Sequence, residues 1–291
     1  IQYDYVDRVN TDSLLDDAIT TMLAKLDPHS VYIPKDELQR VTESMQGKFA
    51  GIGVSFLIHE DSVAISGVIK GGPSEKAGIK AGDRIIAANS DTLFGKSLIK
   101  KAGFTEAERG TFEGNRKMSD AVMKALKGEP DTKVNVKVYR RSTNQILNFP
   151  ITRGDVSITS VSAHYMINNT LGYIKVDRFA RTTYKEFKKA LDELIGKGMT
   201  SLALDLRGNP GGYMDIANMI IDEFLEDGKL IVFTKSKSGA VDKSFSTDKG
   251  DFEHGKIFVL IDQNSASASE IVAGALQDND KGTIVGRRSF G

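Results

Sequence analysis

The spacing of apolar residues changes along the chain. Near the N-terminus apolar side chains recur at the helical period, in this set: Leu14, Leu15, Ala18, Ile19, Met22, Leu23 and Leu26. This pattern predicts a helix that stops before Pro28, and a second helix is expected over Lys35 to Met45. Around Gly47 alternating apolar positions flanked by glycine replace the pattern. We therefore expect a helical N-terminal segment over residues 1–45, followed by strands and helices.

The middle of the chain, residues 46–153, reads as short strands with an amphipathic helix and a shorter helix opened by Pro73 and closed by Gly78. The predicted elements are Phe49 to Phe56, Val63 to Ile69, Arg84 to Ala88, Val134 to Tyr139, and the helix Asp120 to Leu126. Residues 94–117 are long and polar for a connection, so we expect an inserted loop there.

Residues 154–291 alternate between strands and helices. The predicted strands are Val156 to Val161, Leu171 to Val176, the run from Ser201, Leu230 to Thr234, and Ile257 to Ile261; the predicted helices are Thr182 to Ile195 and Asp215 to Leu225. Such alternation is typical of an α/β core with parallel strands.

Composition narrows the possible functions. Lys plus Arg and Asp plus Glu both number 39, so no net field favours nucleic acid or a membrane. No apolar run approaches 18 residues, and no signal peptide is visible. The chain lacks cysteine, and its four histidines are scattered without metal-ligand spacing, so we expect no metal and no cofactor. Because it starts at Ile1 and stops within a motif, we expect a fragment.

A strand, a sharp turn and a helix follow one another around Ser267. The apolar run Ile257 to Ile261 leads through small residues into Ile271 to Leu276. This arrangement places a hydroxyl at the helix N-terminus, where the dipole and unpaired N–H groups favour a nucleophile or an oxyanion. A structural explanation competes, because a serine followed three residues later by Glu270 is also a capping box.

A second glycine-rich turn, Asp205 to Gly212, follows a predicted buried strand. It lacks the Lys-Ser/Thr pair of a phosphate loop and does not fit the dinucleotide fingerprint. For Asp205 and Arg207 we expect a local ion pair or turn hydrogen bonds in preference to catalysis.

Three strings, Ser265 to Glu270, Ala273 to Asp278 and Gly286 to Gly291, together resemble the active-site region of the carboxy-terminal processing proteases, which are serine peptidases with a Ser–Lys dyad. The resemblance implies that Ser267 is the nucleophile. It implies an oxyanion hole from the backbone of Ala268 and of Gly211 or Gly212. The general-base lysine is expected directly after Gly291, outside this sequence, so residues 1–291 alone are expected to be inactive.

The string from Gly71 to Asn89 resembles a bacterial PDZ domain, a module that binds peptides by strand addition. The resemblance implies a carboxylate-binding loop at Phe49, Ala50, Gly51, Ile52 and Gly53. Four apolar residues would line a pocket for the last side chain: Val54, Phe56, Val122 and Leu126. Alternatively, the glycines of this loop only permit a tight turn and bind no peptide. We expect partners with free apolar C-termini.

The string Leu26 to Pro34 is also similar to the N-terminal region of these proteases. Its Asp27 and His29 are better explained by a proline-centred turn than by catalysis.

Taken together, the sequence predicts an α+β multidomain protein with a helical N-terminal segment, a PDZ domain and a crotonase/Clp-like α/β peptidase core. The expected function is a serine endopeptidase of the cell envelope, periplasm or exterior, and a possible homo-oligomer, which recognises substrate C-termini. The alternatives are a non-catalytic PDZ peptide-binding protein and a crotonase-like acyl-ligand binder. The last of these leaves the PDZ region unexplained.

Overall fold

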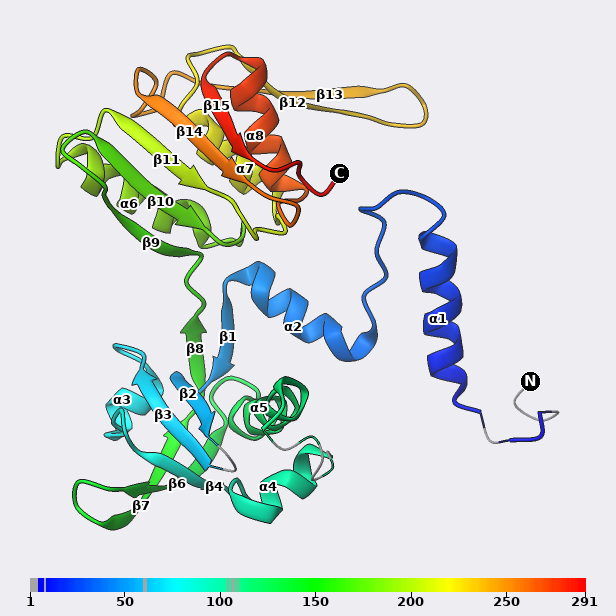
Figure 1. Cartoon of the computed structure of the whole chain (residues 1–291), viewed down its shortest axis with the longest axis vertical. Coiled ribbons are helices and arrows are strands. Elements are labelled where there is room, and N and C mark those ends of the chain that lie inside the picture. Colours follow the sequence, from blue (N-terminus) through cyan, green and yellow to red (C-terminus); the bar gives the residue numbers. More distant parts are fainter. Residues whose placement is uncertain (1–4, 8, 60–61, 104, 106–107, 109) are drawn as a thin grey trace. The chain divides into compact units, whose positions relative to one another are not determined.

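The computed structural model describes residues 5–7, 9–59, 62–103, 105, 108 and 110–291. The chain forms two compact units (Figure 1). We call Lys48–Ile158 the inserted unit, and Ile1–Gly47 with Thr159–Gly291 the main unit. The sequence predicted limits of 46 and 153 for the inserted region. The N-terminal helical segment, predicted as a separate part, groups with the main unit.

The inserted unit is built on an antiparallel sheet with the order β2-β3-β4-β6-β7, and β5 pairs with β4. Its strands are β2 (Val54–His59), β3 (Ser62–Val68), β4 (Arg84–Ala88), β5 (Asp91–Thr92), β6 (Lys133–Arg140) and β7 (Gln145–Thr152). Alternating burial along β6 follows the alternating apolar residues of its sequence. Because β2 stands at the end of this order, one of its edges has no partner strand among the residues that the structure describes.

Three helices belong to the inserted unit: α3 (Pro73–Ala77), α4 (Gly95–Ala102) and α5 (Phe112–Leu126). Helix α4 lies inside the segment predicted as an inserted loop, 94–117, so that prediction was wrong for this part. Leu98 and Ile99 of α4 are buried in the core of the unit, which supplies the packing energy that a short helix needs. Residues 104, 106, 107 and 109 of the predicted loop lie outside the described residues.

A separate antiparallel pair lies at the ends of the inserted unit. β1 (Lys48–Gly51) pairs with β8 (Gly154–Ser157), from Lys48 opposite Ser157 to Gly51 opposite Gly154. Lys48 Nζ also lies 2.6 Å from Asp155 Oδ2. The predicted carboxylate loop therefore begins as a strand. The predicted strand Val156 to Val161 is divided between the end of β8 and the start of the next strand.

The main unit contains a five-stranded sheet with the order β15-β14-β11-β10-β9. Its strands are β9 (Val161–Met166), β10 (Leu171–Val176), β11 (Ser201–Asp205), β14 (Lys256–Ile261) and β15 (Gly282–Gly286). All neighbouring pairs are parallel except β9 with β10. The predicted α/β alternation is thus confirmed for this unit.

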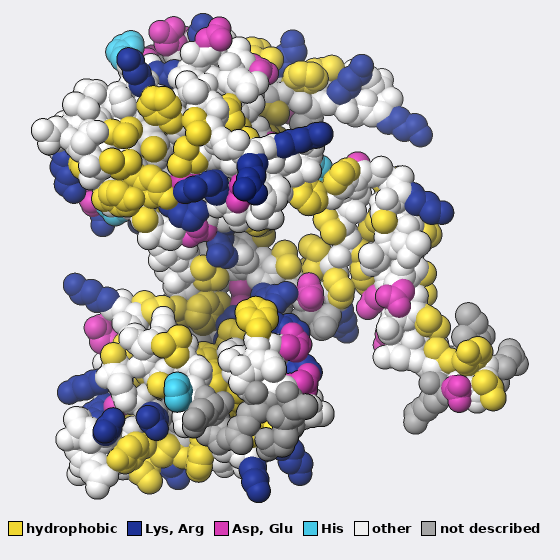
Figure 2. Space-filling model, in the orientation of Figure 1, with side chains coloured by type: hydrophobic (Ala, Val, Ile, Leu, Met, Phe, Trp, Pro, Cys, Tyr) yellow, Lys and Arg dark blue, Asp and Glu magenta, His cyan; other side chains and the backbone are white. Residues whose placement is uncertain are grey.

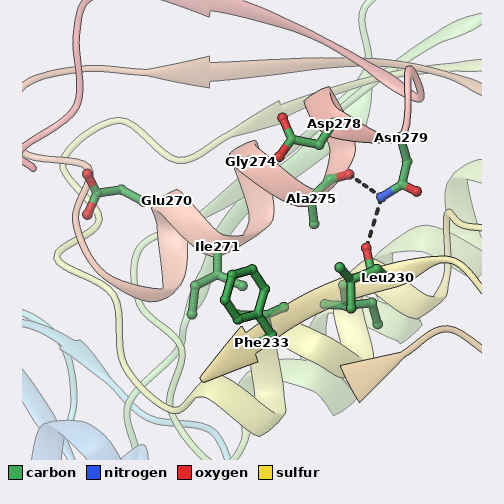
Figure 3. A pocket seen from close by; sticks show the side chains of 10 residues that line it. Leu230, Phe233, Glu270, Ile271, Gly274, Ala275, Asp278 and Asn279 are labelled. Atoms are coloured by element: carbon green, nitrogen blue, oxygen red, sulfur yellow. Dashed lines mark hydrogen bonds between the residues drawn. The ribbon is translucent and has the colours of Figure 1, made fainter. Parts of the chain in front are cut away.

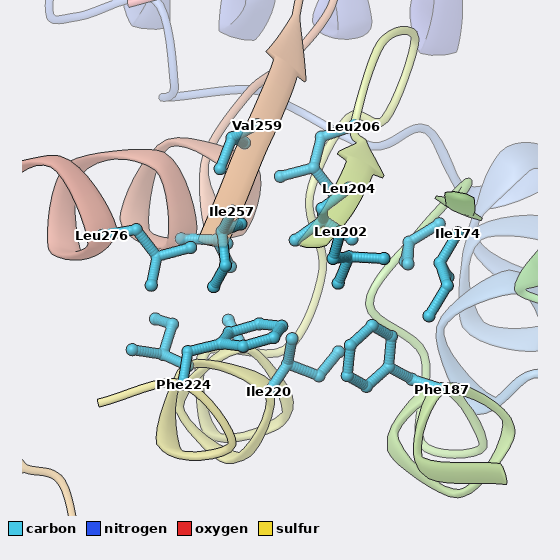
Figure 4. Close-up of a cluster of buried hydrophobic side chains, with 14 of the residues drawn as sticks. Ile174, Phe187, Leu202, Leu204, Leu206, Ile220, Phe224, Ile257, Val259 and Leu276 are labelled. Carbon is cyan, nitrogen blue, oxygen red and sulfur yellow. The ribbon is translucent and has the colours of Figure 1, made fainter. Parts of the chain in front are cut away.

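Helices α6 (Thr183–Ile195), α7 (Met214–Asp222) and α8 (Ala268–Asp278) form a layer against this sheet. Figure 4 shows Leu202, Leu204 and Ile257 of the strands facing Phe187 of α6 and Leu276 of α8. All five side chains are at most 2% exposed. This burial of apolar surface, at about 25 cal/mol per Å², is the main force that holds the strand ends in place.

The remaining elements of the main unit are the hairpin β12 (Leu230–Lys235) with β13 (Val241–Phe245), and helices α1 (Thr11–Leu23) and α2 (Lys35–Gln46). Asn10 caps α1 through its side chain, and every residue of α1 is described and none is buried. The end of α2 is tied to the main sheet region, where Arg181 N–H donates to Met45 O (3.0 Å).

Basic and acidic side chains both lie on the face drawn in Figure 2, in keeping with their equal numbers. Within the described residues, no helix combines the length and the apolar character that a membrane crossing needs.

Candidate active site

The site forms where two neighbouring parallel strands end. β11 runs into the glycine-rich turn at Gly208–Gly212, and β14 runs into the serine-rich turn before α8. Carboxyl ends of parallel strands meet at one edge of a sheet, so these turns lie side by side. Leu206 N–H donates to Leu260 O (2.9 Å), and Ala266 N–H donates to Asn209 O (3.1 Å).

Two of the serines before and within α8 hold the turns together. Ser265 Oγ donates to Leu206 O at 2.8 Å, and Ser269 Oγ donates to Asn209 O at 2.9 Å. Both residues are fully buried. Their hydroxyl groups therefore add a second donor to these buried backbone carbonyls, and neither is free to react.

Ser267 differs from its two neighbours, because it is exposed. Its backbone has φ 53° and ψ −114°, a conformation that is strained for a residue with a side chain. The turn places Ser267 at the N-cap of α8, and the Glu270 carboxylate accepts its N–H at 2.7 Å. The capping box predicted from the sequence is therefore present, and Ser267 remains exposed at the helix N-terminus.

Gly211 is the closest approach of the glycine-rich turn to Ser267. A Cβ built on Gly211 would lie 2.8 Å from Ser267 Cβ and 3.0 Å from Ala268 N. A Cβ on Gly212 would meet Phe179 O at 2.3 Å, and both glycines have positive φ, at 100° and 146°. A side chain at Gly211 would push the two turns apart, and one at Gly212 would clash with the backbone of Phe179.

The backbone N–H groups distinguish the two glycines. The Gly211 N–H is already used, since it donates to Asn209 Oδ1 at 2.8 Å. The N–H groups of Gly212 and Ala268 have no acceptor within hydrogen-bonding distance among the described residues. Of the two glycines left open by the sequence, Gly212 is thus the one that can offer a donor.

Asp205 and Arg207 form the local ion pair that the sequence predicted. Arg207 Nη2 lies 2.7 Å from Asp205 Oδ2, and the Tyr173 hydroxyl donates to the same oxygen at 2.6 Å. Burial raises the pKa of Asp205, but these hydrogen bonds outweigh it and lower the pKa to about 2. Burial and the neighbouring Asp205 raise the pKa of Tyr173 to about 12. Asp205 is therefore charged and Tyr173 neutral at neutral pH, and their hydrogen bonds stabilise the turn.

Glu270 joins three segments of the chain. Its Oε1 accepts the Gly291 N–H at 2.9 Å, and its Oε2 lies 3.0 Å from His29 Nε2. Burial raises the pKa of Glu270, but hydrogen bonds from Gly291, His29, Ser289 and Ser267 outweigh it and lower the pKa. Glu270 is therefore charged at neutral pH.

The turn expected around Asp27 is confirmed, since Asp27 Oδ1 accepts the His29 N–H (2.9 Å) and its Oδ2 accepts the Ser30 hydroxyl (2.7 Å). The sequence explained Glu270 as a cap and His29 as part of this turn. It missed that both side chains meet beside Ser267. The only signal for their proximity was the family resemblance of the string around His29.

Comparison with known proteins gives this geometry its context. Residues 170–291 match peptidase family S41, and residues 50–151 match the PDZ domain. The carboxy-terminal processing protease CtpB of Bacillus subtilis (strain 168) is 33% identical over 297 residues, which cover 100% of this chain and 57% of that protein. The chain carries a peptidase family S41 region and a PDZ domain.

The chain is also similar to other processing proteases. CtpA of Bacillus subtilis (strain 168) is 32% identical over 292 residues, covering 100% of this chain and 58% of that protein. The carboxy-terminal-processing protease of Bartonella bacilliformis (strain ATCC 35685 / KC583 / Herrer 020/F12,63) is 30% identical over 296 residues, covering 100% and 63%. The chain thus spans less than two thirds of each of these relatives. The solved photosystem II D1 C-terminal processing protease is 26% identical, with a TM-score of 0.48, over 100% of this chain and 73% of that one.

A hollow of about 340 Å³ lies beside α8 of the S41 region (Figure 3). Glu270, Ile271 and Gly274 line it from the helix, and Leu230 and Phe233 line it from β12. Figure 3 shows the Phe233 ring next to Ile271, with Gly274 leaving the helix surface open. The lining is mixed, since it also includes Asp278 and Asn279, and it reaches Glu270 in the first turn of α8, which carries Ser267 at its N-cap.

The PDZ residues predicted to bind peptide gather around β2. Val54 and Phe56 lie on this edge strand and are partly buried. Val122 and Leu126 of α5 are 0% and 4% exposed, so they lie beneath the surface in the hydrophobic core of the unit. Gly53 has φ 74°, which requires glycine at the start of β2. The binding roles of these residues, and of Phe49 to Ile52, stay predictions.

Proposed function

We propose that the protein is a serine endopeptidase in which Ser267 is the nucleophile. The observation that carries this proposal is the position of Ser267: an exposed hydroxyl on a strained turn, at the N-terminus of α8, in contact with a turn whose Gly212 N–H is unused. A strained strand-to-helix turn that exposes a serine is a recurring solution for nucleophiles. The two other nearby serines are buried and hydrogen-bonded.

The proposed reaction is acyl transfer. Ser267 Oγ attacks the peptide carbonyl carbon, and the carbonyl oxygen becomes an oxyanion that accepts hydrogen bonds from the N–H groups of Gly212 and Ala268. Each such donor typically lowers the barrier by about 3 kcal/mol. The general base takes the Ser267 hydroxyl proton and gives it to the leaving amine, and water then hydrolyses the acyl-enzyme.

The general base of this proposal is a lysine directly after Gly291. One oxygen of Glu270 accepts the Gly291 N–H and the other accepts the Ser267 N–H. These two hydrogen bonds keep the end of the sequence at Gly291 close to the proposed nucleophile. A side chain on the next residue would start within this arrangement. Burial next to the turns would lower the pKa of the lysine and keep it neutral at working pH. A polypeptide that ends at Gly291 would lack the base, and we expect it to be inactive.

Substrate selection is proposed to involve two places. The free edge of β2 in the PDZ domain would pair with a substrate C-terminus by strand addition, with Val54 and Phe56 favouring an apolar last residue. The hollow beside α8, with Leu230, Phe233 and Ile271, would hold an apolar side chain near the scissile bond.

The experiment that tests the function compares full-length wild-type protein with Ser267→Ala. Two measurements are made: hydrolysis of a peptide with an apolar free C-terminus, and covalent labelling by a fluorophosphonate. We expect wild type to cleave and label, and Ser267→Ala to do neither while still binding the peptide. Ser142→Ala, which removes an exposed hydroxyl on the β6–β7 turn, should behave as wild type.

Equal cleavage by wild type and Ser267→Ala would refute the nucleophile assignment. Peptide binding by wild type without cleavage or labelling would instead favour a non-catalytic peptide-binding protein. Blocking the peptide C-terminus as an amide should weaken binding if the PDZ domain holds a free carboxylate.

A further inference from the structure

We propose that His29 is a positioning residue of the active site, which acts through Glu270 on the backbones of Ser267 and Gly291. The proposal rests on the proposed function. It goes beyond that function by assigning part of the site to the N-terminal segment, which lies outside the S41 match at residues 170–291.

The first observation is the set of contacts around one carboxylate. Glu270 Oε2 accepts the Ser267 N–H (2.7 Å) and lies 3.0 Å from His29 Nε2, while Oε1 accepts the Gly291 N–H (2.9 Å). His29 is separated from Glu270 by 241 positions, so this contact is a product of the fold. His29 Nε2 thus shares Oε2 with the Ser267 N–H, and the Gly291 N–H takes the other oxygen. Without it, the side chain of Glu270 gains rotational freedom and both backbone contacts loosen.

The second observation is ring packing at the end of the chain. The His29 ring lies edge-on to the Phe290 ring, with centroids 5.6 Å apart and planes at 80°. A Cβ built on Gly291 would lie 2.6 Å from His29 Cε1, so the imidazole fills the space that a side chain at 291 would take. Phe290 is itself tied to the serine turn, since its N–H donates to Ser265 O at 3.0 Å.

The third observation is that a hydrogen bond to Asp27 fixes the backbone of His29. Its N–H donates to Asp27 Oδ1 at 2.9 Å, within the turn that Asp27 also closes through Ser30. The backbone of His29 is therefore fixed independently of the contact between its ring and Glu270. With its backbone fixed, the imidazole can restrain the positions of Glu270 and Phe290.

The test uses full-length protein with three substitutions at one position. His29→Ala removes donor and ring, His29→Phe keeps a ring without the donor, and His29→Gln keeps an N–H donor at a similar distance from the backbone. The control is His164→Ala, which breaks a similar exposed pair, His164 Nε2 with Glu193 Oε2 at 2.9 Å, between β9 and α6. Measured quantities are kcat, KM and amide hydrogen exchange in peptides that contain Ser267 and Gly291.

We expect His29→Ala and His29→Phe to lower kcat by about 10- to 100-fold with little change in KM, as expected for a misplaced nucleophile. Hydrogen exchange at both peptides should be faster, and His29→Gln should restore much of both losses. His164→Ala should match wild type in every measurement.

Wild-type kcat and exchange in His29→Phe would overturn the proposal, because the donor would then be dispensable. A failure of His29→Gln to restore either quantity, with His29→Phe impaired, would also overturn it. If wild type neither cleaves nor labels, the proposed function fails. Unchanged exchange in His29→Ala would then refute the positioning role independently.

Discussion

Gly211 lies against Ser267: a Cβ placed on Gly211 would come within 2.8 Å of the Cβ of Ser267. The same Cβ would lie 2.7 Å from Ala266 O. Real Cβ atoms do not tolerate such contacts with backbone atoms, so the two turns that form the site touch at a glycine. This contact fixes how far the Gly212 N–H stands from the serine.

We first predict that Gly211→Ala and Gly212→Ala each reduce turnover by at least about 100-fold, since each would displace the oxyanion donors. Gly208→Ala is the matched control. Gly208 also has a positive φ, 74°, but its Cβ would meet nothing within 4 Å, so only backbone strain of about 1 kcal/mol is expected. Initial rates and thermal unfolding of the three variants separate the two effects. A Gly211→Ala variant as active as Gly208→Ala would contradict the proposed geometry.

Alanine substitutions of the three serines should affect different properties. Ser265→Ala and Ser269→Ala each leave a buried carbonyl without its hydroxyl donor, at Leu206 and Asn209, and should lower the free energy of unfolding by about 1–3 kcal/mol. Ser267→Ala removes an exposed hydroxyl and should change it by no more than about 0.5 kcal/mol. Urea unfolding of the three variants measures this ordering. A loss of stability in Ser267→Ala equal to the others would show a structural role for its hydroxyl.

Gly274 offers a test of the hollow beside α8. A Cβ there would meet nothing within 4 Å, so Gly274→Ala should stabilise the helix by about 0.5–1 kcal/mol. Gly274→Leu should fill the hollow and weaken kcat/KM for a substrate with a large apolar side chain by about tenfold or more. A substrate with alanine at that position should be affected less. Equal effects on both substrates would place the hollow outside the substrate path.

Stability at acidic pH should depend on Asp205. Its pKa in the folded protein, about 2, lies below the ordinary value of 3.8, so the charged form is favoured by folding. The stabilisation is present above pH 4 and is lost as the pH falls towards 2. The wild type should lose about 2 kcal/mol more than Asp205→Asn between pH 5 and pH 2. Parallel curves of unfolding free energy against pH for the two proteins would refute the shift.

The sequence predicted best those elements whose residues carry their own signal. The strand Leu171 to Val176 and the helix ending at Ile195 have clear periodicity, and the structure has both within one residue. Helix α4 was missed because Leu98 and Ile99 form too short an apolar group to stand out in a polar segment. The strand pairing of Phe49 with Val156 depends on residues more than 100 positions apart, which no local pattern reports.

The site shows the same division. The contact of the two turns follows from the rule that parallel strands end at one edge. The roles of Ser267 and of the glycine pair, in contrast, were implied by the family resemblance. The sequence could not separate Gly211 from Gly212, because the choice depends on Asn209 Oδ1 accepting one N–H. It also could not place His29 beside Glu270, since this contact comes from the path of the N-terminal segment.

The pairing of β1 with β8 brings the two ends of the PDZ region together, so this region is a cassette, a segment that can be removed or replaced as one piece. Lys48 stands opposite Ser157, so the chain enters and leaves the cassette on adjacent, hydrogen-bonded strands. Directly paired residues of antiparallel strands have Cα atoms about 5 Å apart. A tight turn could therefore close the gap if residues 48–158 were removed, and a different binding module could replace them without lengthening the connection. The inserted unit and the main unit can thus change separately, because the two ends of the inserted unit meet.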